Sequence, residues 1–409
     1  MTSVATRVAA LCDVIQEHRR TGTVISARRA AAISARVDDV AATAAEGSPR
    51  ACRRKRRMAN ARGYKQEGRR VGEGERGVVV RARHRTTGQA VAVKSLHRRR
   101  GGSHAADVLR EACFTAAGGG HPSLVAFRTV ARAPGTTDYY IVMDHVGPSL
   151  RSVMADRGGW PFPEAEARRV MRQLLAGAEA IHRHGVVHRD IKPDNILVGD
   201  GGAGAVKICN YGVAKSVAEK DPPQAFAGTM AYMAPEVLVK NADHDTLADV
   251  WSLGCVMVEI LTGKLPFAVA AKDEDDEAKQ LFKIFDVLGV PCKRAWQALK
   301  PQVHDDKVQV WRARQLRDRH GSSRNRLREL VSEEILSGDG FQVLKGLLTC
   351  DPEKRLTAAA ALRCPWFTDN VDDAVASERT TKVTMIAAVA SKPWSLATSF
   401  VRRALGLLQ

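Results

Sequence analysis

The chain has 409 residues, of which 44% are hydrophobic and 26% charged, and these proportions exclude a wholly disordered protein. No stretch of about 18 apolar residues lacks a charge, so we expect no membrane span. Lys and Arg number 63 against 45 Asp and Glu, a formal net charge of +18 that suits acidic partners without naming one. The eight cysteines form no C-x-x-C pair and no apolar leader opens the sequence, which together predict reduced thiols in an intracellular protein.

Residues 1–62 are rich in Ala and Arg and hold 13 Lys and Arg against five Asp and Glu. Near their end stands a basic run, made of Arg53, Arg54, Lys55, Arg56 and Arg57. Such a run indicates a nuclear-import signal or a nucleic-acid patch, and a solvated, disordered linker is the plainer alternative. No aromatic stacking motif accompanies this charge, which argues against nucleic acid as the main partner. We therefore expect a partly disordered N-terminal extension on a nuclear or cytoplasmic protein.

From Tyr64 onward the pattern becomes that of folded structure. Residues 78–80, 90–93 and 139–143 are β-rich runs, and the first two are separated by a turn-like segment. After Pro148 the apolar residues recur with helical spacing, for example over 164–182 and 250–261. The sequence therefore predicts an α+β fold, in which a small β-rich lobe precedes a larger helical lobe. Residues 368–409 form a tail whose apolar residues fit an amphipathic helix.

Three glycines stand at the start of the first lobe. Gly72, Gly74 and Gly77 fit the pattern G-x-G-x-x-G, and a strand follows them where a dinucleotide-binding fold would have a helix. Because glycine lets backbone N–H groups approach a phosphate closely, we predict a hairpin that covers phosphates. Lys94 on the next strand can hold phosphates as a point charge, and Glu111 on a predicted helix can pair with it.

The segment from 188 to 195 reads His-Arg-Asp-Ile-Lys-Pro-Asp-Asn. Asp190 can accept the proton of an attacking hydroxyl group, and Asn195 can ligate Mg²⁺. Lys192 can neutralise charge that builds on a transferred phosphoryl group. Together with the glycines and Lys94 in this order, the segment predicts phosphoryl transfer.

With these motifs, residues 64–367 resemble a eukaryotic protein kinase domain, which implies a two-lobed fold with an N-lobe at 63–146 and a C-lobe at 147–367. Residues 228–236, 249–254 and 351–356 resemble later landmarks of that family, and the resemblance implies that Glu236 pairs with Arg355. Lys192 within the catalytic loop is the pattern of Ser/Thr kinases. Residues 281–291 are similar to cyclin-dependent kinases, and the whole chain is most similar to the F-type cyclin-dependent-kinase-like proteins of plants.

This resemblance implies a protein Ser/Thr kinase that transfers the γ-phosphate of Mg-ATP to protein hydroxyl groups, with ATP and Mg²⁺ as cofactors. Met143 would gate the adenine pocket, and Asp144 would offer a hinge backbone group. The full set of ATP-binding residues that the resemblance implies is Val71, Gly72, Gly74, Gly77, Val79, Ala92, Lys94, Glu111, Met143, Asp144, Val146 and Leu197.

The metal-binding Asp-Phe-Gly motif of the family is replaced by Asn210, Tyr211 and Gly212. The metal would then be held by Asn195 and Asn210, and an amide offers one neutral oxygen where a carboxylate offers two charged ones. A loss of about 4 kcal/mol in transition-state stabilisation would slow the chemistry roughly 10³-fold. Two readings therefore stay open, an active kinase and an ATP-binding pseudokinase scaffold.

Three further departures concern regulation. Glu75 and Arg76 replace the inhibitory Thr-Tyr pair of cyclin-dependent kinases, and Ala225 stands at the usual activating phosphosite. Ser216 is a more distant candidate for phosphorylation. The cyclin-contacting helix motif is not recognisable around 106–117, which argues against cyclin dependence and leaves another regulatory partner protein open.

Overall fold

The structure is a computed structural model that describes residues 63–74, 76–98, 104–118, 120–132, 138–199, 204–219, 227–269, 277–317 and 325–368. The basic run at 53–57, Glu75, Ala225 and the expected tail helix lie outside the described residues, so the proposals made for them stay predictions. The chain divides into two units, residues 1–364 and 365–409. In the second unit, the structure describes only α14 (Pro365–Thr368).

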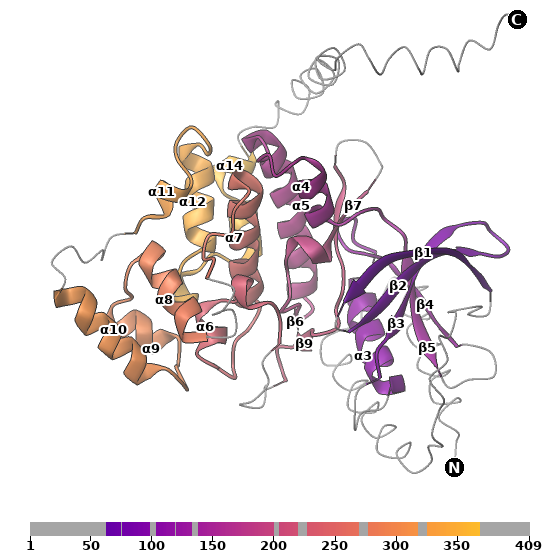
Figure 1. Ribbon diagram of the computed structural model, residues 1–409, viewed down its shortest axis with the longest axis horizontal. Helices are drawn as coiled ribbons and strands as arrows, with labels where there is room; N and C mark the ends of the chain where they lie inside the picture. Colours follow the sequence, from indigo (N-terminus) through magenta and orange to yellow (C-terminus); the bar gives the residue numbers. More distant parts are fainter. Residues whose placement is uncertain are drawn as a thin grey trace, which may run out of the picture. The chain divides into compact units, whose positions relative to one another are not determined.

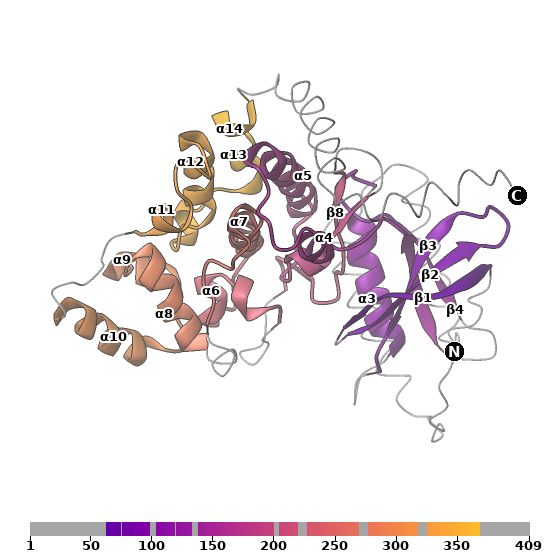
Figure 2. The same cartoon turned by 45° about the horizontal axis from the view of Figure 1, so that its top comes forward.

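The N-terminal part of the first unit is an antiparallel sheet with the strand order β1-β2-β3-β5-β4. Helix α3 packs against this sheet through β3, β4 and β5 (Figures 1 and 2). The bounds of these elements are β1 (Tyr64–Gly74), β2 (Gly77–His84), β3 (Ala90–Leu96), α3 (His104–Ala117), β4 (Phe127–Arg132) and β5 (Tyr139–Asp144). The three strands predicted from β-rich runs are confirmed as β2, β3 and β5.

Alternation along β3 gives the sheet two apolar faces, because successive side chains of a strand point to opposite sides. Val91 and Val93 belong to the hydrophobic cluster of one face. Ala92 belongs to the cluster of the other face, which includes Val108 and Leu109 of α3. Lys94 follows Ala92 with the same parity, so its side chain lies on the face that α3 covers. The strand thereby places this lysine beside the helix that carries Glu111.

The C-terminal part of the first unit is mainly helical and is built around α7, of which nearly every residue is buried. Helix α5 packs against α7 and α13. The bounds are α4 (Leu150–Asp156), α5 (Glu164–His182), β6 (Val186–Val187), η1 (Pro193–Asn195), β7 (Ile196–Val198), β8 (Val206–Ile208), β9 (Lys215–Ser216), η2 (Met230–Tyr232), α6 (Pro235–Leu238), α7 (Leu247–Thr262), α8 (Glu277–Leu288), α9 (Lys293–Ala298), α10 (Asp305–Arg317), α11 (Leu327–Leu330), α12 (Gly338–Leu347), η4 (Pro352–Lys354) and α13 (Ala358–Leu362).

Two short antiparallel sheets of two strands each hold the segment that carries the catalytic motif. Strand β6 pairs with β9 and precedes this segment, while β7 pairs with β8 and follows it. The predicted contact between Glu236 and Arg355 is confirmed, since Arg355 donates to both carboxylate oxygens at 2.5 and 2.9 Å. The architecture is therefore the predicted α+β fold with a β-rich lobe and a helical lobe. Within the described ranges, no helix combines the length and apolarity that crossing a membrane requires.

Candidate active site

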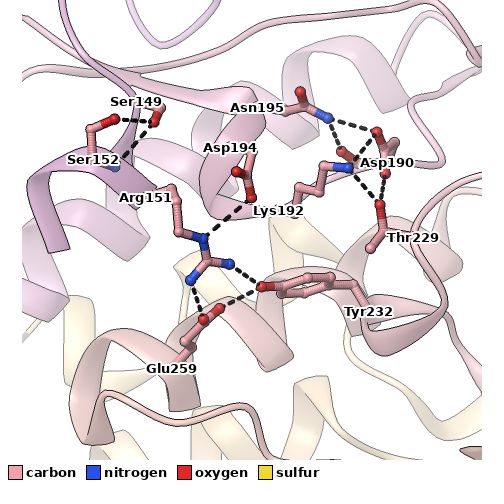
Figure 3. A network of polar contacts seen from close by, with 10 residues as sticks. All are labelled: Ser149, Arg151, Ser152, Asp190, Lys192, Asp194, Asn195, Thr229, Tyr232 and Glu259. Carbon is pink, nitrogen blue, oxygen red and sulfur yellow. Dashed lines mark hydrogen bonds and ion pairs between the residues drawn. The ribbon is translucent and has the colours of Figure 1, made fainter. Parts of the chain in front are cut away.

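Asp190 stands on the loop between β6 and β7 and is in contact with three other polar side chains (Figure 3). Its Oδ1 accepts a hydrogen bond from the Thr229 hydroxyl at 2.7 Å, and its Oδ2 accepts one from Asn195 Nδ2 at 2.7 Å. Lys192 Nζ donates to the same Thr229 hydroxyl at 2.5 Å and lies 3.4 Å from Asp190 Oδ2. The structure thus brings the three predicted catalytic residues together and adds Thr229 to them.

Asp249 on α7 fixes the backbone of this segment. One carboxylate oxygen accepts the backbone N–H of Arg189 at 2.8 Å, and the other accepts the backbone N–H of His188 at 2.8 Å. His182 Nε2 lies 2.9 Å from the same carboxylate. Burial by itself raises the pKa of Asp249, but His182 and His188 outweigh it, and the net pKa is lowered. The carboxylate is therefore charged at neutral pH and can hold both N–H groups.

Lys94 begins a second chain of contacts. Its ammonium group donates to Glu111 Oε1 at 2.5 Å and to Asn210 Oδ1 at 2.8 Å. Asn210 Nδ2 then donates to Asn195 Oδ1 at 2.8 Å, and Asn195 donates onward to Asp190. Lys94 and Glu111 are only 5% and 3% exposed, so their predicted pairing is confirmed as a buried ion pair. One hydrogen-bonded chain therefore links the first lobe to the catalytic segment.

Most of the residues expected around the adenine base share one hydrophobic cluster. Ala92 and Met143 are buried in it, and Val79, Val146 and Leu197 pack against it. Val71 is not part of this cluster, because its side chain is 47% exposed on β1. Asp144 pairs with Val91 across β3 and β5, and its carboxylate accepts from Arg128 Nε.

The glycine-rich segment forms the predicted hairpin at the end of β1 and β2. Gly72 pairs with Val79, and Gly74 pairs with Gly77. A Cβ atom at Gly77 would lie 2.1 Å from the carbonyl oxygen of Ser95, so only glycine lets β2 pack this closely against β3. The hairpin, the Lys94–Glu111 pair and the apolar cluster together form a site suited to a nucleotide.

The protein kinase domain family matches residues 65–367 of the chain. The chain is 44% identical over 308 residues to the putative cyclin-dependent kinase F-2 of Oryza sativa subsp. japonica, a match that covers 73% of the chain and 88% of that relative. The chain belongs to the protein kinase family. It is 34% identical over 305 residues to cyclin-dependent kinase G1 of Arabidopsis thaliana, covering 73% of the kinase and 48% of that relative, and it therefore spans about half of that longer protein.

A third relative comes from outside the plants. The kinase is 32% identical over 305 residues to cell division control protein 2 homolog 3 of Trypanosoma brucei brucei, and the match covers 73% of the kinase and 90% of that relative. These relatives identify a cyclin-dependent-kinase-like Ser/Thr kinase domain, as the sequence predicted.

The family implies ATP and Mg²⁺, and the residues present fit the first better than the second. Both predicted metal ligands, Asn195 and Asn210, are amides that hydrogen-bond to each other. Among the described residues, no group of three His, Cys, Asp or Glu side chains gathers as a metal site. A divalent cation prefers charged oxygen ligands, and this pair offers none. The kinase therefore lacks a tight site for Mg²⁺ at this position.

Tyr211 takes the place of the phenylalanine of the family motif. Its ring is 1% exposed and packs edge-on against His188, with the ring centroids 5.0 Å apart. The prediction that a tyrosine ring still packs here is confirmed. The hydroxyl group is buried and finds no hydrogen-bond partner in the described part of the chain.

The start of the activation segment is held without phosphorylation. Ser216, the distant candidate phosphosite, is fully buried on β9, so another kinase cannot reach it unless this strand opens. The prediction that named it is therefore corrected. Arg110 of α3 donates to Glu219 Oε2 at 2.5 Å, and Arg189 Nε donates to the carbonyl oxygen of Val213 at 2.5 Å. These contacts tie the segment to α3 and to the catalytic loop.

A second polar cluster lies beside the catalytic loop (Figure 3). Arg151 of α4 donates to Glu259 Oε1 at 2.5 Å and to the hydroxyl oxygen of Tyr232 at 2.7 Å. The Tyr232 hydroxyl donates in turn to Glu259 Oε2 at 2.6 Å. Arg151 Nε also lies 3.4 Å from Asp194. The cluster joins α4, η2 and the C-terminal end of α7.

Sequence reasoning missed the roles of Thr229 and Asp249. Both stood inside segments that resemble family landmarks, but nothing local indicates that either side chain contacts the catalytic loop. Thr229 is 39 residues from the aspartate it contacts, and Asp249 is 60 residues from Arg189. An acidic residue in the first turn of the mostly apolar helix 247–262 is a signal that marks Asp249, but Glu259 on the same helix shares it.

Proposed function

We propose that the kinase transfers the γ-phosphate of ATP to Ser and Thr hydroxyl groups of proteins. The observation that carries this proposal is the contact of Asp190 with both Lys192 and Thr229, on a loop linked through the two amides to Lys94. In this proposal Lys94 holds the phosphates, and the apolar cluster that contains Ala92 and Met143 holds the base, which its burial supports.

In the proposed reaction, the substrate hydroxyl oxygen forms a bond to the γ-phosphorus, and the bond from that phosphorus to the bridging oxygen of ADP breaks. The substrate hydroxyl group takes the place of the Thr229 hydroxyl beside Asp190, and Asp190 accepts its proton. Lys192 stabilises negative charge on the transferred group. A bound divalent cation would supply further charge stabilisation to the phosphates.

The test is phosphate transfer from labelled ATP to a generic basic protein, with the full chain and with Mg²⁺ or Mn²⁺. We expect Asp190→Asn to lower the rate by about 10²-fold or more, as for loss of a general base. Asp306→Asn on the exposed surface of α10 is the matched control and should leave the rate unchanged. Equal rates for wild type and Asp190→Asn would contradict the proposal.

A nucleotide-binding scaffold is the second candidate, because the amide of Asn210 is engaged by Lys94 and Asn195. In the same assay, Asn210→Asp separates the two. If the wild type is silent and Asn210→Asp transfers phosphate, the scaffold is supported. If the wild type transfers phosphate and Asp190→Asn does not, the kinase works without the metal carboxylate.

A further inference from the structure

Arg76 reaches from the glycine-rich hairpin to the residues that replace the metal-binding motif. It stands between Gly74 and Gly77, at the tip of the hairpin of β1 and β2. Its Nη1 donates to the carbonyl oxygen of Gly212. The side chain is therefore partly buried and crosses from the hairpin to Gly212.

Gly212 shows how close these groups lie. A Cβ atom placed on Gly212 would be 2.8 Å from Arg76 Cδ, 3.2 Å from Glu111 Oε2 and 3.4 Å from Asn210 Oδ1. Glu111 Oε2 is buried and has no hydrogen-bond partner among the described residues. Arg76 thus adds its positive charge beside the Lys94–Glu111 pair and the amide of Asn210.

The polarity of the amide chain is fixed from its two ends. Lys94 only donates, so Asn210 must turn its oxygen toward Lys94 and its N–H group toward Asn195. Asp190 only accepts while it is ionised, so Asn195 must turn its N–H group toward Asp190. Each amide oxygen therefore already accepts one hydrogen bond, and a cation would have to share that neutral oxygen with the donor.

The charge around Asn210 is more positive than it would be in a site where a carboxylate binds the metal. Asn210 is neutral where a carboxylate would be negative, and Arg76 adds a positive charge a few ångströms away. A guanidinium group carries several N–H donors in a plane, a geometry that matches phosphate oxygens and allows it to hold the Gly212 carbonyl as well. Because Arg76 is partly buried, its charge attracts an anion more strongly than it would in water.

We propose that Arg76 and Lys94 hold the phosphates of ATP between them, and that the kinase binds ATP without a divalent cation. This inference deepens the proposed function, since it concerns the same nucleotide site. It does not depend on phosphate transfer, because it concerns only the affinity for ATP. In that affinity, the charge of Arg76 takes the place of a metal ion.

The test is the affinity of the full chain for ATP, measured by calorimetry in EDTA and again in Mg²⁺. We expect the two dissociation constants to agree within about threefold, since the cations that hold the phosphates are side chains. Arg76→Gln should weaken binding by about tenfold in EDTA and by less in Mg²⁺, and Arg76→Lys should lie between it and the wild type. Arg85→Gln, in the turn after β2 and away from Gly212, is the matched control and should bind as the wild type does.

Asn210→Asp should invert the metal dependence. It restores a carboxylate next to Lys94, so we expect weaker binding in EDTA and a gain of about tenfold or more on adding Mg²⁺. Thermal unfolding of each variant without ligand verifies that the hairpin still folds. If Arg76→Gln has a lower melting temperature than the wild type, Arg76→Met is used in its place.

The results separate this inference from the proposed function. Binding that requires Mg²⁺, or an Arg76→Gln variant that binds ATP in EDTA as well as or better than the wild type, would overturn the inference while leaving kinase activity possible. Binding in EDTA without any phosphate transfer would overturn the kinase proposal and support the inference. No binding under either condition would overturn both.

Discussion

The hydroxyl group of Tyr211 is the one polar atom of its ring, and it is buried where the family motif has none. Burial raises the pKa of this hydroxyl, so it stays protonated and needs a partner for its proton. A buried hydroxyl without a hydrogen bond costs stability. We expect Tyr211→Phe to raise the free energy of unfolding by about 1 kcal/mol, measured by urea denaturation. A decrease would show that the hydroxyl is satisfied in solution.

At the same scale, Glu236 and Arg355 form an ion pair whose side chains are 3% and 0% exposed. Removing one partner leaves the other charge buried and uncompensated. We expect Glu236→Gln to lower the free energy of unfolding by about 3–5 kcal/mol, whereas a surface substitution such as Glu333→Gln should change it by less than about 0.5 kcal/mol. Equal unfolding midpoints for these two variants would contradict the importance of this pair.

At the scale of elements, α3 and the activation segment are joined by Arg110 and Glu219. Both side chains are about one-third exposed, so solvent screens the pair and its global contribution is below about 1 kcal/mol. Its local effect is larger, since it links α3 directly to the segment that follows β9. We expect Glu219→Gln to leave the melting temperature nearly unchanged but to speed amide hydrogen exchange at 214–219.

Hydrogen exchange resolved by mass spectrometry measures this effect. Glu353→Gln, in the short helix η4, serves as the control and should leave exchange at 214–219 unaltered. Unchanged exchange in both variants would mean that the pairing of β9 with β6 and the contact of Arg189 with Val213 hold the segment without this ion pair.

At the scale of the whole molecule, Asp249 couples stability to pH. Its folded-state pKa is lowered below the ordinary value of 3.8, so its contribution is present above that pH and is lost as the pH falls through the folded-state pKa. We expect Asp249→Asn to destabilise the kinase at pH 7 by about 3 kcal/mol, and the difference from wild type to shrink below about pH 4. Denaturant unfolding across pH 3 to 7 measures the difference, and a constant gap over that range would contradict it.

The sequence predicted the parts of the site that are carried by local patterns. The order of the glycines, Lys94 and the 188–195 segment was enough to place Asp190, Lys192 and Asn195 in one site. The pair Lys94–Glu111 was predicted from the residues themselves, and the pair Glu236–Arg355 followed from the resemblance. Contacts that depend on how distant elements dock were not predictable. The reach of Arg76 to Gly212 spans 136 residues, and the burial of Ser216 depends on the pairing of β9 with β6.

The backbone of the catalytic segment is not shaped by its own residues alone. Arg189 has φ of 68° and Asn210 has φ of 70°, values in the left-handed region that an asparagine tolerates better than an arginine. The carboxylate of Asp249 on α7 holds the Arg189 N–H group in this conformation. A peptide cut from 186–198, or the same residues grafted onto another scaffold, would relax away from it. The catalytic geometry therefore depends on the packing of α7 beneath it, and it cannot be transplanted as a motif.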